Sequence, residues 1–160
     1  MKERILTSLL TVFVISGIQA QAPSPVPRLV VGLTIDQLRA DYIEAFSALY
    51  GERGFKRLLK EGRIYTNAEY DFINVDRSSA TASIYTGTTP YYNGIPSNRW
   101  MDRGSLRIIK SVDDQDFMGV YTSESSSAKL LRCSTLSDEL KVATQGRAEV
   151  YSIAPTREMA

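Results

Sequence analysis

The sequence predicts an α/β sandwich with a mostly parallel central sheet, and three observations support this fold class. Nearly continuous apolar runs rich in β-branched residues occur at 29–36 and 148–154, as in strands that are buried on both faces. Segments with helical spacing of apolar residues, such as 37–51 and 134–146, alternate with these runs. The composition, with 43% apolar and 23% charged residues, is that of an ordinary globular protein. Strands that alternate with helices are typical of α/β folds.

The first 22 residues predict a secretory signal peptide. A short basic start precedes the apolar run 5–18, and the small residues at 20–22 form a cleavage-site pattern. The run is short for a membrane span, which needs roughly 20 residues, although an uncleaved anchor helix is the alternative. We therefore expect a periplasmic or secreted protein with no stable membrane anchor after cleavage. A Pro-rich spacer at 23–28 and a single domain at 29–160 follow the signal peptide.

The remaining elements are predicted from periodicity, capping residues and turn formers. Strands are expected at 29–36, 63–72, 105–112 and 148–154. Helices are expected at 37–51, 54–62, 78–87 and 134–146. Loops rich in turn formers or serine are expected at 88–100 and 113–128. The helix at 54–62 is expected to turn Phe55, Leu58 and Leu59 inward.

The chain contains no histidine and one cysteine, with 19 basic and 18 acidic side chains and a net charge of +1. Histidine is the commonest zinc ligand and general base, so a Ser-His-Asp triad and a histidine-containing zinc site are excluded within this chain. The balanced charge gives no electrostatic case for binding a nucleic-acid polymer. Cys133, just ahead of a helix, is expected to be a structural thiol.

Three groups of residues lie where chemistry occurs in such a fold. Ligands bind beyond the carboxyl ends of parallel strands, and Asp36 ends the first predicted strand, where it either ligates a metal or caps the next helix. The segment 76–79 begins a helix whose free N–H groups suit phosphate. Within it, Ser78 is either an activated nucleophile or, like Asp76, a helix cap. Asn98 either donates to an anionic oxygen or fixes its own turn.

Together these motifs resemble the alkaline phosphatase superfamily, in particular its secreted bacterial phosphomonoesterases and type I phosphodiesterases (nucleotide pyrophosphatases). The resemblance lies in LVVGLTIDQLRADY, GFKRLLKEG, SIYTGTTPYYNGIPSNRW, and STLSDELKVAT followed by VYSIA. It covers nearly all of residues 29–154 and implies a three-layer sandwich, incomplete in this chain. It also implies a two-zinc hydrolase of small-molecule phosphate esters, in which Asp36 ligates zinc and Asn98 contacts a phosphoryl oxygen.

Several positions depart from the family pattern. The family nucleophile is a threonine or serine six residues before the position of Ser83, and Arg77 stands there. Arginine stays protonated and cannot attack phosphorus, so Ser78 would serve only if the turn shifts by one residue. Ala80-Thr81 replaces a Gly-His pair, and Asn93 replaces a histidine.

The end of the chain also departs from the pattern. A Lys-x-Arg pair of the phosphomonoesterase branch is matched by Thr156 and Glu158, or by Arg157 if the alignment moves by one residue. The other zinc ligands of the family lie farther along than Ala160, so this chain supplies at most one ligand, Asp36, whereas each zinc needs about three. The resemblance therefore implies an N-terminal fragment of a longer protein or a truncated gene product.

Three hypotheses of function follow. In the first, the chain is the N-terminal part of an exported phosphoric ester hydrolase that uses Ser78. In the second, the protein is catalytically inactive, and Arg77 and Asn98 bind a phosphate or sulfate ester. In the third, the chain is a non-functional remnant whose exposed strand edges make it aggregate.

Overall fold

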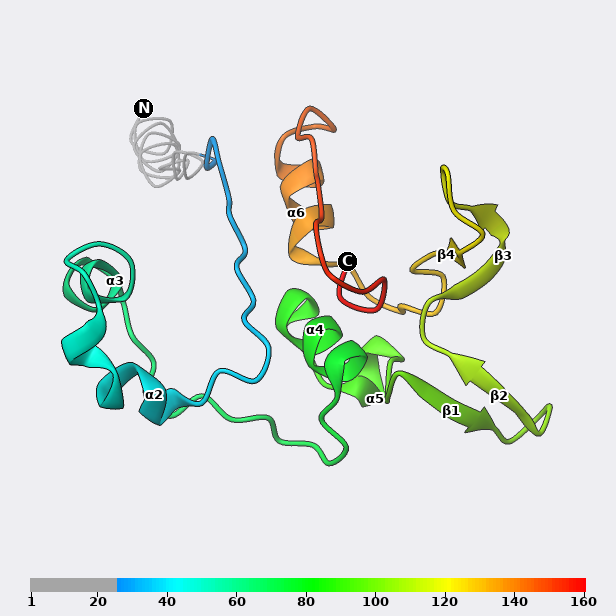
Figure 1. Ribbon diagram of the computed structural model, residues 1–160. Helices are drawn as coiled ribbons and strands as arrows, with labels where there is room; N and C mark the ends of the chain where they lie inside the picture. Colours follow the sequence, from blue (N-terminus) through cyan, green and yellow to red (C-terminus); the bar gives the residue numbers. More distant parts are fainter. Residues whose placement is uncertain (1–25) are drawn as a thin grey trace, which may run out of the picture. The chain divides into compact units, whose positions relative to one another are not determined.

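The computed structural model of the protein describes residues 26–160, which Figure 1 traces in colour. The predicted signal peptide at 1–22 lies outside the described residues. Residues up to Val30 belong to one unit, and residues 31–160 form a second unit that carries every helix and strand named below. No helix within the described residues is long and apolar enough to cross a membrane.

The helix predicted at 37–51 is divided into two short pieces. Helix α2 spans Ala40–Ala45, and the 3-10 helix η1 spans Ser47–Leu49. The rings of Tyr42 and Phe46 meet edge to face with their centroids 5.5 Å apart. The Tyr50 hydroxyl donates to the carbonyl oxygen of Tyr42 over 3.0 Å, which closes the segment on itself.

Helix α3 spans Phe55–Glu61 and confirms the helix predicted at 54–62. It begins after Gly54, whose φ of 73° lies in the left-handed region that favours glycine. The expectation that its apolar side chains turn inward is wrong for Leu58 and Leu59, which are 62% and 43% exposed. Amphipathic spacing predicts which face of a helix is apolar, but it cannot say whether another element covers that face.

Helix α4 spans Arg77–Thr86 and confirms the helix predicted at 78–87. Asp76 begins it with a capping box, and Gly87, with φ of 66°, ends it in the left-handed conformation. The predicted loop at 88–100 contains a single-turn helix, α5, which spans Pro90–Asn93 with proline in its first turn.

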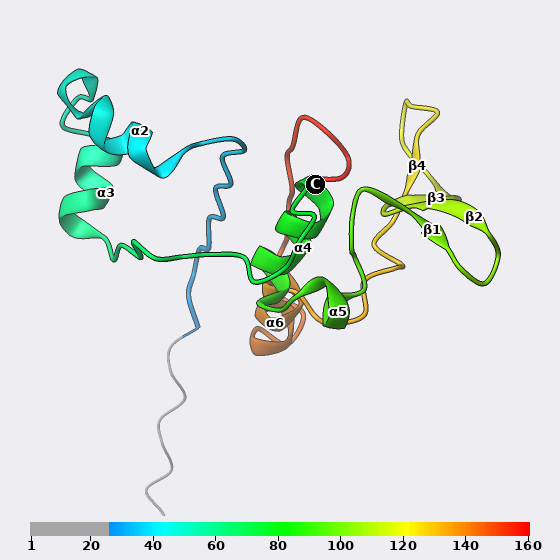
Figure 2. The same ribbon diagram turned by 90° about the horizontal axis from the view of Figure 1, so that it is seen from below.

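Two antiparallel hairpins follow, and Figure 2 shows the first of them at the edge of the view. Strand β1, Arg99–Asp102, pairs with β2, Arg107–Lys110, which confirms the strand predicted at 105–112. Strand β3, Asp113–Met118, pairs with β4, Ser125–Ser126. The loop predicted at 113–128 is therefore wrong, because this segment forms a hairpin whose strands are polar.

The other three predicted strands are not formed in the described residues. Segments 29–36, 63–72 and 148–154 belong to neither sheet, and both sheets are two-stranded and antiparallel. Their apolar side chains stay exposed, with Leu33 at 79% and Ile153 at 99%. A parallel strand exists only where neighbouring strands accept and donate its backbone hydrogen bonds, and no such neighbour occurs within residues 26–160.

Helix α6 spans Leu136–Ala143 and confirms the helix predicted at 134–146. Thr135 and Asp138 form its capping box: the Asp138 N–H donates to the threonine hydroxyl over 3.2 Å, and the Thr135 N–H donates to the carboxylate over 2.8 Å. This backbone hydrogen bond holds the pKa of Asp138 below its usual value.

The best-buried part of residues 26–160 surrounds the start of α4 and is mainly polar. Ile95 is the buried apolar side chain there, alongside Ser78, Ser79, Asn93, Ser111 and Asp114. Asn93 joins α5 to α4, since its Nδ2 donates to Ser83 Oγ over 3.3 Å and its Oδ1 accepts from the Ile95 N–H over 2.9 Å. Because buried polar groups must be hydrogen-bonded, these contacts fix the local structure.

Gly32 and Thr34 contact helix α4 through the side chain of Tyr85. The Thr34 hydroxyl lies 3.3 Å from the hydroxyl of Tyr85, which belongs to α4. A Cβ built on Gly32 would lie only 2.7 Å from the same tyrosine oxygen. Glycine at position 32 therefore allows this segment to lie against the helix.

Candidate functional site at the start of helix α4

Asp76 organises the start of α4 and the loop residues 94–98 that precede β1. Its Oδ1 accepts the Ser79 N–H and hydroxyl, each over 3.0 Å, and its own N–H donates to Ser79 Oγ over 2.9 Å, which completes the capping box. Its Oδ2 accepts the Ser97 hydroxyl over 2.7 Å and the Asn98 N–H over 2.6 Å. One carboxylate thus fixes both the first turn of the helix and the loop that carries Asn98.

Burial and hydrogen bonding act in opposite directions on Asp76. Burial by itself raises the pKa of this carboxyl, because it disfavours the charged form. The hydrogen bonds from Ser79, Ser97 and Asn98 favour the charged form and together outweigh burial, so the pKa of Asp76 lies below its usual value. The group at the helix start is therefore a carboxylate at neutral pH.

Asn98 is tied to the first turn of α4 by its side chain. Its Oδ1 accepts the Ser78 N–H over 2.9 Å. Within residues 26–160 no acceptor is hydrogen-bonded to its Nδ2, so the two amide hydrogens remain available as donors. The Asp76 carboxylate and the Ser78 N–H thus hold Asn98 in place, and donation by Asn98 to an anionic oxygen stays a prediction.

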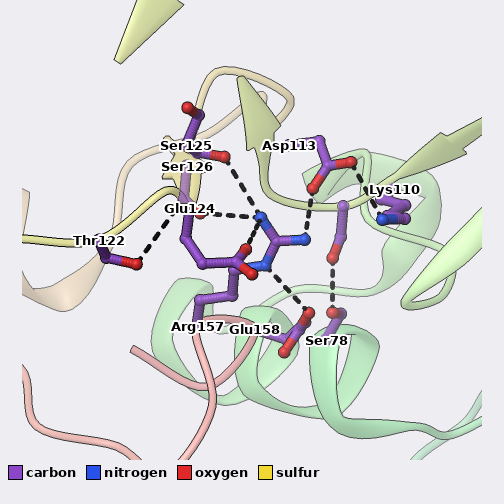
Figure 3. A network of polar contacts seen from close by, with 10 residues as sticks. Ser78, Lys110, Asp113, Thr122, Glu124, Ser125, Ser126, Arg157 and Glu158 are labelled. Atoms are coloured by element: carbon purple, nitrogen blue, oxygen red, sulfur yellow. Dashed lines mark hydrogen bonds and ion pairs between the residues drawn. The ribbon is translucent and has the colours of Figure 1, made fainter. Parts of the chain in front are cut away.

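Ser78 is placed differently from an exposed nucleophile. Its hydroxyl is 2.7 Å from the hydroxyl of Ser111, and both side chains are buried, at 3% and 1% exposure. Figure 3 shows Ser78 beside the arginine network described later. Ser111 also donates its N–H to the carbonyl oxygen of Asn98 over 2.9 Å. Sequence reasoning missed Ser111, and no motif in the sequence marks a contact between residues 33 positions apart.

Arg77 and Asp36 form an ion pair at the site. The Arg77 Nε donates to Asp36 Oδ2 over 2.9 Å, across 41 positions of the sequence. Both side chains are partly exposed, at 46% and 40%. Asp36 does not cap the next helix, because α2 begins after Arg39 without any side-chain cap. The structure thus brings all four predicted site residues to one place: Asp36, Arg77, Ser78 and Asn98.

The described residues do not by themselves fit the two zinc ions that the resemblance implies. Within residues 26–160 no group of three or more His, Cys, Asp or Glu side chains is placed to hold a metal ion. Asp36, the predicted ligand, already neutralises a guanidinium. A cation at Asp36 would be repelled by Arg77, because like charges disfavour each other at such a distance.

A second arginine, Arg157, is surrounded by carboxylates (Figure 3). Its Nη2 lies 2.5 Å from Asp113, its Nη1 lies 2.9 Å from Glu124, and its Nε lies 3.5 Å from Glu158. Nη1 also donates to β4, to the Ser125 carbonyl oxygen over 3.3 Å. Arg157 therefore holds the last described residues against the β3–β4 hairpin, with its donors turned toward protein acceptors.

The chain is similar in sequence to one protein family and to several alkaline phosphatases. The family model described as type I phosphodiesterase / nucleotide pyrophosphatase matches residues 30–147. The chain is 40% identical over 131 residues to alkaline phosphatase PhoV of Synechococcus elongatus, covering 80% of this chain and 24% of that protein. It is 35% identical over 153 residues to alkaline phosphatase PafA of Elizabethkingia meningoseptica, covering 91% of this chain and 28% of that protein. A protein of Myroides odoratus named calcium-transporting ATPase is 36% identical over 131 residues, which cover 80% of this chain and 24% of that protein.

Solved structures agree with the sequence comparison. The crystal structure of wild-type PafA matches with a TM-score of 0.81 and 31% identity, covering 86% of this chain and 27% of that one. This match confirms the predicted alkaline-phosphatase-like α/β fold in incomplete form. A PafA variant also matches, and its substituted threonine and asparagine are 21 positions apart, as positions 77 and 98 are here. The chain spans about a quarter of the length of these relatives.

Proposed function

Because the chain belongs to the type I phosphodiesterase / nucleotide pyrophosphatase family of the alkaline phosphatase superfamily, we propose that it carries the phosphoryl-binding part of a protein that binds small phosphate esters. In this proposal Arg77 and Asn98 donate hydrogen bonds to the phosphoryl oxygens. The relatives are named alkaline phosphatases, and this likeness supports a phosphate ester as the ligand class.

One observation carries the proposal: Arg77 begins α4, Asn98 is hydrogen-bonded to the first turn of α4, and each keeps side-chain N–H groups without a protein acceptor within residues 26–160. The Asn98 Oδ1 is engaged by Ser78, so its Nδ2 faces away from that contact as a donor. Arg77 uses Nε for Asp36 and is 46% exposed, so its Nη groups are accessible. A guanidinium and an amide donor at a helix N-terminus match the geometry and charge of a phosphoryl group.

Hydrolysis by Ser78 is the second candidate, and family membership is what favours it. For that role the Ser78 hydroxyl would have to leave Ser111 and reach solvent, because it is 3% exposed in this structure. A nucleophile also needs a group that accepts its proton or lowers its pKa, and Ser111 supplies only another hydroxyl. We therefore place ester binding ahead of ester hydrolysis for the described residues.

Export belongs to the same proposal and rests on the sequence of residues 1–22. A basic start, an apolar run and a small-residue cleavage site are the pattern of a secretory signal. A periplasmic or secreted protein that binds phosphate esters would meet them outside the cytoplasm. N-terminal sequencing of the protein from the exporting cell tests this, and a mature form that begins near residue 23 is the expected result.

Paired substitutions in the full-length protein test the binding role. Isothermal titration calorimetry with p-nitrophenyl phosphate and release of p-nitrophenol measure binding and hydrolysis separately. Arg77→Ala is expected to weaken binding by about tenfold or more, since hydrogen bonds to charged groups are worth roughly 1.5–3 kcal/mol. Arg39→Ala is the matched control, because Arg39 is likewise paired with an aspartate, Asp41, but away from α4.

The Ser78→Ala variant separates the two candidate functions. Ester binding predicts unchanged affinity and no p-nitrophenol release from either protein. If wild type releases p-nitrophenol, Ser78→Ala abolishes the release and Arg77→Ala leaves affinity unchanged, then Ser78 is the nucleophile and the binding role of Arg77 is wrong.

A further inference from the structure

We propose that Asp36 is a positioning residue for Arg77, and that this ion pair lets the site bind a phosphate ester without a metal ion at Asp36. This inference rests on the proposed function, and it adds what orients the guanidinium of Arg77 toward the phosphoryl oxygens. It also assigns Asp36 a role other than the zinc ligand that the resemblance implies.

The pair is formed through one edge of the guanidinium. Asp36 Oδ2 accepts from Nε of Arg77 over 2.9 Å, and within residues 26–160 no protein acceptor is hydrogen-bonded to the Nη groups. A guanidinium is planar with five N–H donors in a fixed fork, so fixing Nε also fixes the direction of the two Nη groups. That fork matches two oxygens of one phosphoryl group.

Asp36 comes from outside the helix that carries Arg77, which makes it an independent anchor. It ends the segment 31–36, which also contacts α4 through the hydroxyls of Thr34 and Tyr85. Arg77 is the first residue of α4 and is about half exposed, so without a partner its side chain has many accessible rotamers. A side chain that is already oriented loses less conformational freedom when the ligand binds, and affinity rises accordingly.

The same pair disfavours a metal ion at Asp36. The negative charge of Asp36 is balanced by Arg77 at hydrogen-bond distance, and no three acidic or cysteine side chains gather within the described residues. A divalent cation would have to displace the guanidinium or lie beside it against charge repulsion. Arg77 thus supplies the positive charge that a metal ion would supply, and the ester is bound by hydrogen bonds.

The change in phosphate affinity of Asp36→Asn shows whether Asp36 orients Arg77 or acts only through its negative charge. If Asp36 acts only as a negative charge near an anion, its neutralisation raises affinity for phosphate. If Asp36 positions Arg77, the same substitution lowers affinity, and we expect a loss of about three- to tenfold. Asp36→Glu, which restores the carboxylate, is expected to recover part of the affinity. Asp41→Asn is the matched control, since Asp41 pairs with Arg39 over 2.7 Å at a distance from α4 in the chain.

The experiment is calorimetric titration of the full-length protein with inorganic phosphate, in EDTA and without it. We expect the same affinity in both buffers, a loss for Asp36→Asn, and no further loss when Asp36→Asn is added to Arg77→Ala. Loss of binding in EDTA, or tighter binding by Asp36→Asn, would overturn the inference while leaving phosphate binding by Arg77 in place. If wild type and Arg77→Ala bind phosphate equally, or neither binds it, the proposed function fails and the inference with it. Circular dichroism of each variant shows that its fold is retained, and Asp36 is exposed enough for substitution.

Discussion

Replacing Asp76 with alanine should destabilise the protein more than any other single loss of a helix cap described above. The substitution removes a capping box, which is worth about 1 kcal/mol. It also removes the acceptor for the Ser97 hydroxyl at 2.7 Å and for the Asn98 N–H at 2.6 Å. Hydrogen bonds to a charged acceptor contribute about 1.5 kcal/mol each at the low end, and water replaces part of this at a half-buried site. We therefore expect a loss of about 3 kcal/mol.

The matched comparison is Thr135→Ala in helix α6. Thr135 also belongs to a capping box, but its partner is Asp138 within the same helix, and no distant loop depends on it. Its loss should cost about 1 kcal/mol. Asp76→Asn should fall between the two alanine variants, because asparagine caps a helix as well as aspartate does but carries no charge.

The assay is urea unfolding followed by circular dichroism, with the slope of the transition compared between variants. A second measurement is the affinity for inorganic phosphate. It should fall in Asp76→Ala, because the Asn98 N–H loses the carboxylate that holds Asn98 at the first turn of α4. If Asp76→Ala costs no more than Thr135→Ala, the bonds to Ser97 and Asn98 add nothing, and our account of how the loop is held is wrong.

Three further outcomes are expected, each checked by urea unfolding. Gly94→Ala should cost more than about 2 kcal/mol, because φ is 84° and the new Cβ would lie 2.9 Å from atoms of Leu130 and Arg132. Gly54→Ala is the matched control, since Gly54 has a similar φ of 73° in open space, and it should cost about 1 kcal/mol. Equal costs would show that the atoms around Gly94 move aside without loss of stability. Arg157→Ala should cost about 2 kcal/mol, because Glu124 and Glu158 lose their ion-pair partner and, within the described residues, Asp113 keeps only Lys110. Loss of the exposed helical pair of Arg57 should cost about 0.4 kcal/mol, and equal losses would show that Arg157 does not hold the end of the described residues to the β3–β4 hairpin. The pKa of Asp76 is lower in the folded protein than in the unfolded chain, so its contribution to stability is complete above the ordinary carboxyl pKa of about 3.9 and is lost as the pH falls through the folded value. The free energy of unfolding should therefore fall less steeply with acid in Asp76→Asn than in wild type. An equally steep fall in both proteins would show that other groups cause the loss of stability in acid.

The helices that could be predicted are those whose ends are decided locally. Helix α4 is delimited by Asp76 and Gly87, and α6 by the capping box at Thr135. These signals act within one turn of chain, so the sequence contains them in full. The hairpin β3–β4 was missed for the opposite reason: its strands are polar and lack the alternation of apolar residues that marks a half-buried strand.

The sequence predicts Asp36, Arg77, Ser78 and Asn98 as candidate site residues but not how they contact one another. The structure joins Asp36 to Arg77 and Ser78 to Asn98 by hydrogen bonds, and their roles stay predictions. The pairing of Asp36 with Arg77 spans 41 positions, and the covering of Ser78 by Ser111 spans 33. Side-chain pairs at such separations depend on how loops pass one another, which no local pattern records.

Gly32 has a consequence for the site although it takes no part in any chemistry. A Cβ at position 32 would lie 2.7 Å from the Tyr85 hydroxyl oxygen, so a larger residue there would move either the tyrosine side chain or the segment 31–36, which also contacts Tyr85 through Thr34. Asp36 lies four residues after Gly32 in the same segment, so a change at position 32 would also alter how Asp36 reaches Arg77.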